Sequence, residues 1–341
     1  MDISSPILVD GESAASYGTD IIPVGTAVRV RVRGSTGNVG PGYDSFGLAL
    51  GRYDELTVER TDEPLLLDVR GEGSGSVPRT EEHLVIRAMR TAWRAIGMHA
   101  LPGLRVEAVN AIPHSRGMGS SASAIVAGVV AANAMVPQNL RLSENAMLQI
   151  CSQMEGHPDN VAPSLFGGLV ISYSGADGFH SVSVPVHEDV VPVVAVPDYE
   201  VPTRIARGLI PESVPHREAA VNSGRAALLV HAMKDEPSEL FAGTEDSLHQ
   251  QYRASAMGPS AALVAHLRGR GLAAIVSGAG PTVLVLAANA SEAERAAEAM
   301  DDFCGTPANV LDDRIVNWDV ERLTVDGNGV IVDHIEPGTL R

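Results

Sequence analysis

The most informative segment of this 341-residue chain reads Ile112-Pro113-His114-Ser115-Arg116-Gly117-Met118-Gly119-Ser120-Ser121-Ala122-Ser123. It stands directly before a run of small apolar residues, 124–135, which is typical of a buried helix. Glycines let a backbone approach an anion closely, and the helix that follows directs free N–H groups and its positive dipole end toward that anion. The hydroxyls of Ser120 and Ser121 can hydrogen-bond a phosphate or complete the coordination of a metal ion. The segment predicts a phosphate-binding loop; the alternative is a glycine turn that only caps a buried helix.

The same segment excludes a Walker-type nucleotide site, because Ser120 stands where the P-loop pattern requires a lysine. The chain holds one lysine, Lys234, among its 25 basic residues, so the other 24 are arginines. Nearly every mechanism that uses a lysine Schiff base, pyridoxal chemistry included, is excluded for the same reason. A bound triphosphate would have to be neutralised by backbone amides, serines, Mg²⁺ and arginine.

The composition predicts a packed protein without a nucleic-acid partner. Hydrophobic residues make up 45% of the chain and charged residues 20%, whereas the formal net charge is −17, which repels polyanions. The two cysteines, Cys151 and Cys304, are too few for a disulfide framework and form no CxxC motif. The N-terminal residues lack the pattern of a signal peptide, and no apolar run is long enough to span a bilayer. We expect a cytoplasmic protein that does not bind membranes.

The order of predicted strands and helices indicates an α+β protein rather than a doubly wound sheet. Residues 28–32 alternate with period two, as a half-buried strand does, and 83–96 has helical spacing. Ser143 is a plausible N-cap for a further helix that ends near Met154. The predicted pattern changes near residue 188, after which an apolar strand over 190–196 is followed by several helices. We therefore predict a loose N-terminal extension over 1–24, one domain over 25–188 and a second over 189–341.

Two polar groups stand within turns of the first predicted domain. Asn38 and Asp44 lie in a glycine-rich stretch, 34–51, where an amide and a carboxylate could hold a polar substrate through its hydroxyl and its ammonium. Both are also turn formers, which is the alternative interpretation. Residues 155–160 place Glu155, His157 and Asp159 close together after a helix. A carboxylate at the negative end of a helix dipole often faces a cation, and His157 could instead be a structural hydrogen-bond donor.

The second predicted domain contributes three further candidates. Thr203 and Arg207 share a helical face at i and i+4, although Thr203 follows a proline and could be a cap residue. Asp246, His249 and Arg253 fall on one face of a predicted helix, and this face could equally be solvated. The turn 278–281, Gly-Ala-Gly-Pro, is either a simple hairpin or a point where the second domain's backbone approaches the phosphate loop.

Taken together, these segments resemble the homoserine kinase branch of the GHMP kinases (galactokinase, homoserine kinase, mevalonate kinase, phosphomevalonate kinase). The segment 38–47, Asn-Val-Gly-Pro-Gly-Tyr-Asp-Ser-Phe-Gly, is similar to the first motif of that family, 112–123 to its ATP loop and 277–282 to its third motif. The branch is indicated by 155–163, by 203–211 and by 248–253. The resemblance runs from about Val28 to Ala287, and it implies a ribosomal-protein-S5-like N-terminal domain with a ferredoxin-like C-terminal domain.

The resemblance also implies an activity and a set of roles. The activity is the ATP- and Mg²⁺-dependent phosphorylation of L-homoserine to O-phospho-L-homoserine, a step of threonine biosynthesis. The metal would be held by Ser121, or Ser120, together with Glu155. Catalysis would involve His157, Arg207 and, if a general base operates, Asp159. Homoserine would be surrounded by Asn38, Asp44, His157, Thr203 and Arg207. The ATP phosphates would lie on Pro113, Ser115, Arg116, Gly117, Met118, Gly119, Ser120 and Ser121. Because family members are often dimers, the resemblance allows a homodimer.

The chain departs from the family pattern at three places. Residues 33–37 read Arg-Gly-Ser-Thr-Gly where the family usually has Pro-Ala-Thr-Ser-Ala, and this change could alter the choice of substrate. Met118 replaces a leucine, and Tyr43 replaces a phenylalanine beside the substrate loop. Alternatives to a homoserine kinase are a GHMP-fold kinase for another amino alcohol, a related decarboxylase, and a non-catalytic relative. An NAD-dependent oxidoreductase is disfavoured because the loop lacks GxGxxG and its later acidic residue.

Overall fold

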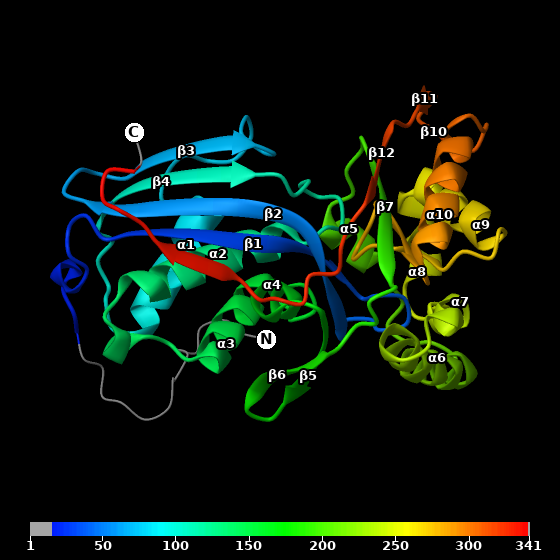
Figure 1. Ribbon diagram of the computed structural model, residues 1–341, viewed down its shortest axis with the longest axis horizontal. Coiled ribbons are helices and arrows are strands. Elements are labelled where there is room, and N and C mark those ends of the chain that lie inside the picture. Colours follow the sequence, from blue (N-terminus) through cyan, green and yellow to red (C-terminus); the bar gives the residue numbers. More distant parts are fainter. Residues whose placement is uncertain (1–15, 340–341) are drawn as a thin grey trace.

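The computed structural model describes residues 16–339, which form two β-sheets with helices packed on them (Figure 1). The first sheet has seven strands in the order β13-β1-β2-β4-β3, and β5 extends it by pairing with both β2 and β6. All its pairings are antiparallel except that of β3 with β4. Its strands are β1 (Ala27–Gly37), β2 (Phe46–Thr61), β3 (Leu66–Gly71), β4 (Gly103–Asn110), β5 (Leu169–Gly175), β6 (Gly178–Val184) and β13 (Ile331–His334).

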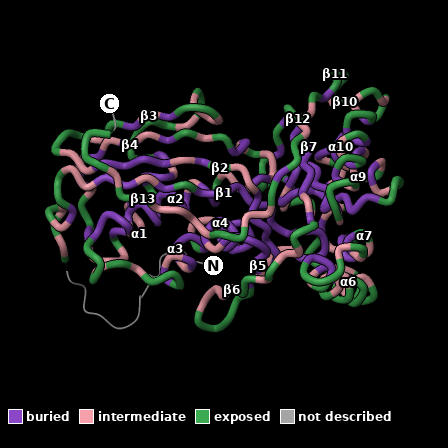
Figure 2. The backbone as a smooth tube through the Cα atoms, viewed as in Figure 1, coloured by how far each residue is buried: buried purple, intermediate pink, exposed green. Residues whose placement is uncertain are grey.

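Four helices belong to the same part of the chain, and α2 lies at its centre. Small and apolar residues occupy every face of α2, so this helix is buried among the sheet and its neighbours (Figure 2). A Cβ on Gly128 would lie 2.5 Å from Val85 O, so the glycine allows α1 to cross α2 closely, and Trp93 Nε1 donates to Ala132 O at 3.1 Å. The helices are α1 (Leu84–Ala95), α2 (Ser120–Met135), α3 (Glu144–Glu155) and α4 (Val161–Phe166).

The second sheet has four strands in the order β12-β7-β9-β8, and α9 and α10 pack beside it. Its strands are β7 (Val191–Pro197), β8 (Ala274–Val276), β9 (Val283–Ala287) and β12 (Trp318–Arg322), and a small hairpin adds β10 (Val310–Leu311) and β11 (Arg314–Ile315). The helices here are α5 (Thr203–Gly208), α6 (His216–Lys234), α7 (Leu240–Gly243), α8 (Gln250–Arg253), α9 (Gly258–Arg268) and α10 (Ala290–Cys304). The predicted mixture of helices and strands in an α+β arrangement is confirmed.

The ends of the chain differ from the predicted division. Of the extension predicted over 1–24, residues 1–15 lie outside the described residues. In the remainder, Thr19–Ile21 forms a 3₁₀ turn and Ile22 is buried in the first core, whereas most of the other residues are exposed. The segment 331–334 was assigned to the second domain, yet it pairs with β1 in the first sheet. The chain therefore crosses between the two sheets twice, once between β6 and β7 and once between β12 and β13.

No helix among residues 16–339 combines the length and the apolar character that a membrane span requires.

Candidate active site

The predicted phosphate loop joins the end of β4 to the start of α2. Three of its residues, Ser115, Gly117 and Gly119, have positive φ angles of 54°, 75° and 72°. Gly119 is the N-cap of α2 and supplies no side chain to the first turn, so the N–H groups of that turn are left for an external partner. The loop and the helix N-terminus thus have the geometry of an anion site.

The second domain closes over this loop. Ser277 Oγ donates to Gly117 O at 2.7 Å, and a Cβ on Gly117 would lie 2.2 Å from Ser277 O. Thr282 N donates to Arg116 O at 3.3 Å. The prediction that the 278–281 turn allows a close approach of the two backbones is confirmed.

Arg116 lies in the loop but is tied to the second domain. Its Nε donates to Pro197 O at 2.9 Å, and its Nη1 lies 3.3 Å from a carboxylate oxygen of Glu200. Nη1 also donates a hydrogen bond to His114 O at 2.9 Å, which holds the guanidinium against the loop itself. The positive charge of Arg116 is therefore partly matched by Glu200, and the anion site depends chiefly on backbone N–H groups and hydroxyls.

A serine and a carboxylate meet at the N-terminus of α2. Ser121 Oγ donates to Glu155 Oε2 at 2.5 Å, and Glu155 is the last residue of α3, whose N-cap is Ser143 as predicted. Burial raises the pKa of the Glu155 carboxyl above its ordinary value, although the hydrogen bond from Ser121 acts in the opposite direction. A partly buried carboxylate at the negative end of a helix is unfavourable without a cation, so this pair is the candidate metal position.

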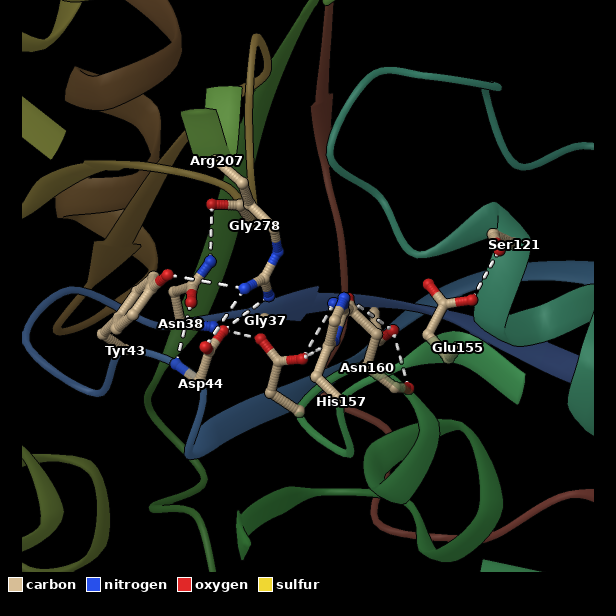
Figure 3. Close-up of polar contacts among 12 residues, drawn as sticks. Gly37, Asn38, Tyr43, Asp44, Ser121, Glu155, His157, Asn160, Arg207 and Gly278 are labelled. Atoms are coloured by element: carbon tan, nitrogen blue, oxygen red, sulfur yellow. Dashed lines mark hydrogen bonds and ion pairs between the residues drawn. The ribbon is translucent and has the colours of Figure 1, made fainter. Parts of the chain in front are cut away.

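The turn after α3 brings the His157 imidazole and the Asp159 carboxylate together with the backbone N–H of Asn38 (Figure 3). His157 Nδ1 is hydrogen-bonded to Asp159 Oδ1, and the other carboxylate oxygen of Asp159 accepts from Asn38 N at 3.1 Å. Burial disfavours the charged imidazole, but the hydrogen bond and the charge of Asp159 outweigh it and raise the pKa of His157. Both oxygens of Asp159 are therefore engaged, and His157 Nε2 is the ring nitrogen left for another partner.

Asp44 and Arg207, predicted to bind the two charged ends of one substrate, are paired with each other. Arg207 Nη2 lies 2.6 Å from Asp44 Oδ1, and Nη1 lies 3.1 Å from Oδ2, which is a bidentate geometry. Asp44 N also donates to Asn38 Oδ1 at 3.0 Å, while Asn38 Nδ2 donates to Gly278 O at 2.8 Å. The pair joins the β1–β2 turn of the first domain to α5 of the second.

Sequence reasoning gave no role to Arg253, which is fully buried at this end of the site. Its Nη1 contacts Gly278 O at 3.1 Å and His249 Nδ1 at 3.2 Å, whereas Nε and Nη2 have no hydrogen-bond partner. The guanidinium also lies 5.6 Å from the centre of the Tyr43 ring. A buried guanidinium with free donors requires an anionic partner, so Arg253 is an additional candidate for the substrate.

The predicted helix carrying Asp246, His249 and Arg253 is wrong in its extent. α8 begins only at Gln250, and Asp246 precedes it and caps it by accepting from the backbone N–H groups of 248, 249 and 250 at 2.8 to 3.1 Å. His249 Nε2 is bonded to Gly40 O at 2.8 Å and its ring stacks on Tyr43. These three side chains are therefore buried at the junction of the domains and do not form a solvated face.

One cavity of about 130 Å³ brings nearly all of these groups together. Asp44 is the one predicted residue outside its lining, and it borders the cavity through Arg207. A second cavity, of about 300 Å³, continues from the same loop and is lined by Ser115, Ser120 and Ser121 as well as by apolar residues of α1 and α2. The first cavity is lined by Asn38, Pro113, Ser115, Arg116, Gly117, Met118, Gly119, Ser120, Ser121, Glu155, His157, Asp159, Asn160, Thr203, Arg207, Arg253, Gly278 and Ala279.

The departure at residues 33–37 has a structural explanation. Arg33 is buried and points to the returning C-terminal segment, where its Nη2 lies 2.9 Å from Asp326 and its Nη1 donates to Gly329 O. The guanidinium also lies 5.1 Å from the centre of the Tyr53 ring. A Cβ on Gly37 would lie 2.3 Å from Asp159 Oδ2, so this glycine makes room for the carboxylate. Arg33 therefore holds the C-terminal crossing and does not face the substrate cavity.

Comparison with known proteins agrees with this geometry. The sequence model of the GHMP kinases N terminal domain matches residues 83–168, and that of the GHMP kinases C terminal domain matches residues 224–306. A homoserine kinase of Streptomyces coelicolor is 46% identical over 307 residues, which cover 90% of this chain and 94% of that protein. The chain belongs to the homoserine kinases, a branch of the GHMP kinases.

Further homoserine kinases support the same assignment. That of Clavibacter michiganensis is 43% identical over 319 residues, covering 93% of this chain and 98% of the relative. The crystal structure of a homoserine kinase from Cytophaga hutchinsonii superposes with a TM-score of 0.78 at 24% identity, over 90% of this chain and 98% of that one, which shows the shared fold. The GHMP kinase resemblance and the two-domain GHMP fold expected from the sequence are confirmed.

Proposed function

We propose that this chain transfers the γ-phosphoryl group of ATP to the side-chain hydroxyl of L-homoserine, giving O-phospho-L-homoserine and ADP. The observation that carries this proposal is the convergence, in one cavity, of an anion-binding loop, a serine–carboxylate pair and two guanidinium groups beside a carboxylate. A phosphoryl donor fits the first of these features, and an amino acid with a free carboxylate and ammonium fits the last.

The nucleotide would occupy both cavities. Its phosphates would lie on the 113–121 loop, where glycine backbone and the α2 N-terminus supply N–H donors. Its adenosine part would extend into the cavity of about 300 Å³, which begins at Ser115, Ser120 and Ser121 and is lined further in by apolar side chains, such as Leu56 and Val77, and by polar ones. The two cavities share residues of the loop, so a single nucleotide can span them.

The Ser121–Glu155 pair has the chemistry of a Mg²⁺ site. Among residues 16–339 no group of three or more His, Cys, Asp or Glu side chains could enclose a metal ion. Mg²⁺ in phosphoryl transfer needs no such group, because it takes one or two protein ligands together with water and substrate phosphates. Burial raises the pKa of the Glu155 carboxyl, so its charged form is disfavoured until a cation balances it. Bound there, the ion would neutralise charge on the phosphates.

The amino acid would lie between the phosphate loop and the two arginines. Its carboxylate fits the unpartnered donors of Arg253 and the fork of Arg207, whereas its ammonium fits Asp44. Since Asp44 and Arg207 are bonded to each other, the substrate must separate the two groups or share them. Asn38, His157 and Thr203, which line the same cavity, can bind the remaining polar groups of the substrate.

The transfer itself requires little covalent chemistry from the protein. The substrate hydroxyl oxygen bonds to the γ-phosphorus, the bond to the bridging oxygen of ADP breaks, and the hydroxyl proton passes to an oxygen of the transferred phosphoryl group or to water. Asp159 is held by His157 and by Asn38 N, so we assign it the positioning of His157 and of the β1–β2 turn more than proton abstraction. Catalysis then rests on alignment and charge neutralisation.

Substrate choice can be tested by Mg²⁺-dependent ADP release with L-homoserine beside L-serine, L-threonine, mevalonate and galactose. We expect kcat/KM for L-homoserine to exceed each of the others by at least about 100-fold, because only homoserine combines the charges and the chain length that the cavity fits. Equal rates with a second amino alcohol would favour a kinase of shifted specificity. The absence of ADP release with every acceptor would favour a non-catalytic relative.

We also propose a homodimer, because members of this family are often dimers. Sedimentation equilibrium at micromolar concentration would distinguish a species of twice the 35.7 kDa chain mass from the monomer.

A further inference from the structure

The peptide that leads into the phosphate loop is held by two charged side chains of β2. Asp54 Oδ1 accepts hydrogen bonds from Ala111 N and Ile112 N, at 2.7 and 2.9 Å. Arg52 Nε donates to Ala111 O at 2.8 Å. The regular pairing of β2 with β4 ends one step earlier, at Glu55 and Val109, so side chains take over the backbone groups that the sheet leaves free.

β2 is irregular at the same place. Arg33 pairs with Tyr53 and Gly34 pairs with Leu50, so two residues of β2, Gly51 and Arg52, form a bulge. Gly51 N donates to Thr324 O at 2.9 Å, and a Cβ on Gly51 would lie 2.3 Å from Thr324 Oγ1. Bulges bend a strand and redirect its side chains. Here the bulge accepts the segment that returns from the second sheet.

Arg52 contacts the second domain as well as the loop. Its Nη1 lies 3.3 Å from Glu321 Oε2 and 3.7 Å from Asp319 Oδ2, both on β12. The same side chain therefore contacts the loop entrance through Nε and an acidic pair of the other sheet through Nη1. Exposed ion pairs of this kind contribute little to stability, so their role here is to fix the position of the Arg52 side chain between the loop and β12.

We propose that Arg52 and Asp54 are positioning residues that set the entrance of the phosphate loop and tie it to the second domain. The inference rests on the proposed function in one respect: the loop is taken to bind nucleotide phosphates. Asp54 fixes the direction of two successive N–H groups at the start of the loop, and Ile112, which follows, is fully buried beneath it. A shift at this peptide would displace Ser115 to Gly119, whose backbone forms the anion site.

Asp54 should make this positioning sensitive to pH. Burial raises the pKa of the Asp54 carboxyl to about 6, against the lowering effect of the N–H groups of Ile112 and Ala111 and of the Arg52 charge. Glu72 adds a further raising effect, and the surrounding cavity also presents Glu55, Glu82, His83 and His114. A carboxylate accepts stronger hydrogen bonds than the protonated acid, so the hold on the loop should weaken as the pH falls through about 6.

The test is the Kd of Mg·ADP, measured by isothermal titration calorimetry between pH 5 and 8 without any amino acid. We expect Asp54→Ala to raise this Kd roughly ten-fold at pH 7.5, about 1.4 kcal/mol, because two buried N–H groups lose their acceptor. Asp54→Asn keeps an acceptor oxygen and should stay within about three-fold of the wild type. The ratio of the wild-type Kd to the Asp54→Asn Kd should rise as the pH falls through 6, since both proteins share every other titration.

Glu59→Gln is the matched control. Glu59 lies on the same strand, is equally buried and accepts one backbone N–H, from Gly338 at 2.9 Å, far along the strand from the loop. The proposal is overturned if Glu59→Gln weakens Mg·ADP binding as much as Asp54→Ala does, or if the pH ratio is flat. If Asp54→Ala does not fold, two other measurements test the proposal. The ratio of the wild-type Kd to the Asp54→Asn Kd should still rise as the pH falls, and Arg52→Gln should bind Mg·ADP roughly three-fold more weakly than the wild type. Binding of Mg·ADP does not require turnover, so failure of the proposed reaction would be seen separately in the acceptor panel.

Discussion

The two ends of the active-site cavity are built in different ways. At the phosphate-loop end, a contiguous stretch, 113–121, presents mainly backbone groups, and glycines with positive φ give it its shape. At the other end, side chains from separate segments meet: Asn38 and Asp44 from the β1–β2 turn, Arg207 from α5 and Arg253 from α8. The comparison teaches that a short contiguous segment can specify an anion site. A site for a substrate with both a positive and a negative charge instead forms only when the two domains pack together.

The largest loss of activity is expected at Glu155, which lies beside Ser121 at the phosphate-loop end. Glu155→Gln should lower kcat/KM by about 1,000-fold, because the carboxylate that faces the proposed metal position is lost. The measurement is ADP release across a range of Mg²⁺ concentrations. Ser121→Ala, which leaves the carboxylate in place, is the matched variant and should lose less. Equal activity of Glu155→Gln and the wild type at saturating Mg²⁺ would remove Glu155 from the metal site.

Glu155 should also oppose stability while it supports activity. Its pKa is raised in the folded protein, so the charged form is disfavoured by folding at neutral pH, and this cost is relieved as the pH falls through the folded pKa. We therefore expect Glu155→Gln to raise Tm at pH 7.5 in the absence of Mg²⁺, and the difference from the wild type to shrink at lower pH. A lower Tm in Glu155→Gln would contradict the assigned cause of the raised pKa.

A smaller loss is expected at Asp159, which lies between the two ends. General bases contribute roughly 100- to 10,000-fold, and the structure gives both Asp159 oxygens to other partners. Asp159→Asn should therefore lower kcat by less than about 100-fold. The measurement is kcat at saturating ATP and L-homoserine, with its pH profile. A larger loss, together with disappearance of an acidic limb from the profile, would make Asp159 the base.

The same comparison explains how far the sequence could predict the site. The loop, the α2 helix and the Ser143 cap follow from short contiguous patterns, and each lies where the sequence placed it. The Asp44–Arg207 pair joins residues 163 positions apart, and local periodicity carries no information about such a contact. From the sequence, Arg253 has a place on a predicted helix face and in the branch segment 248–253 but no role, because its burial depends on the packing of Tyr43 and His249.

The contacts of Arg33 could not be predicted from the sequence for the same reason. The departure from the family pattern at residues 33–37 suggested an altered substrate choice, whereas in the structure Arg33 contacts the C-terminal segment. The β13 strand that this segment leads to was placed in the second predicted domain, yet it pairs with β1 in the first sheet. Both contacts join segments near opposite ends of the chain.

The smallest effect on activity is therefore expected at Arg33. Arg33→Met should lower the free energy of unfolding by about 2–3 kcal/mol, because it leaves Asp326 without its buried partner. Its kcat/KM per folded molecule should stay within about two-fold of the wild type, since Arg33 does not line the cavity.

Urea unfolding and ADP release on the same preparations measure both quantities. Arg29→Met is the control. Arg29 lies on β1, as Arg33 does, and forms a half-exposed ion pair with Glu55 of β2, whose loss should cost less than about 1 kcal/mol. A change in acceptor preference in Arg33→Met would restore the substrate role suggested by the sequence.

The central claim is that the side-chain end of the cavity recognises the carboxylate of an amino acid. The most direct measurement compares kcat/KM for L-homoserine and for 3-aminopropan-1-ol, which lacks the carboxylate, in the wild type and in Arg253→Met. The account predicts that the variant loses roughly 50-fold with L-homoserine but less than about three-fold with the amino alcohol, so that the preference for the carboxylate collapses. Equal losses with both acceptors would contradict it, because Arg253 would then support the fold or the nucleotide and not the carboxylate.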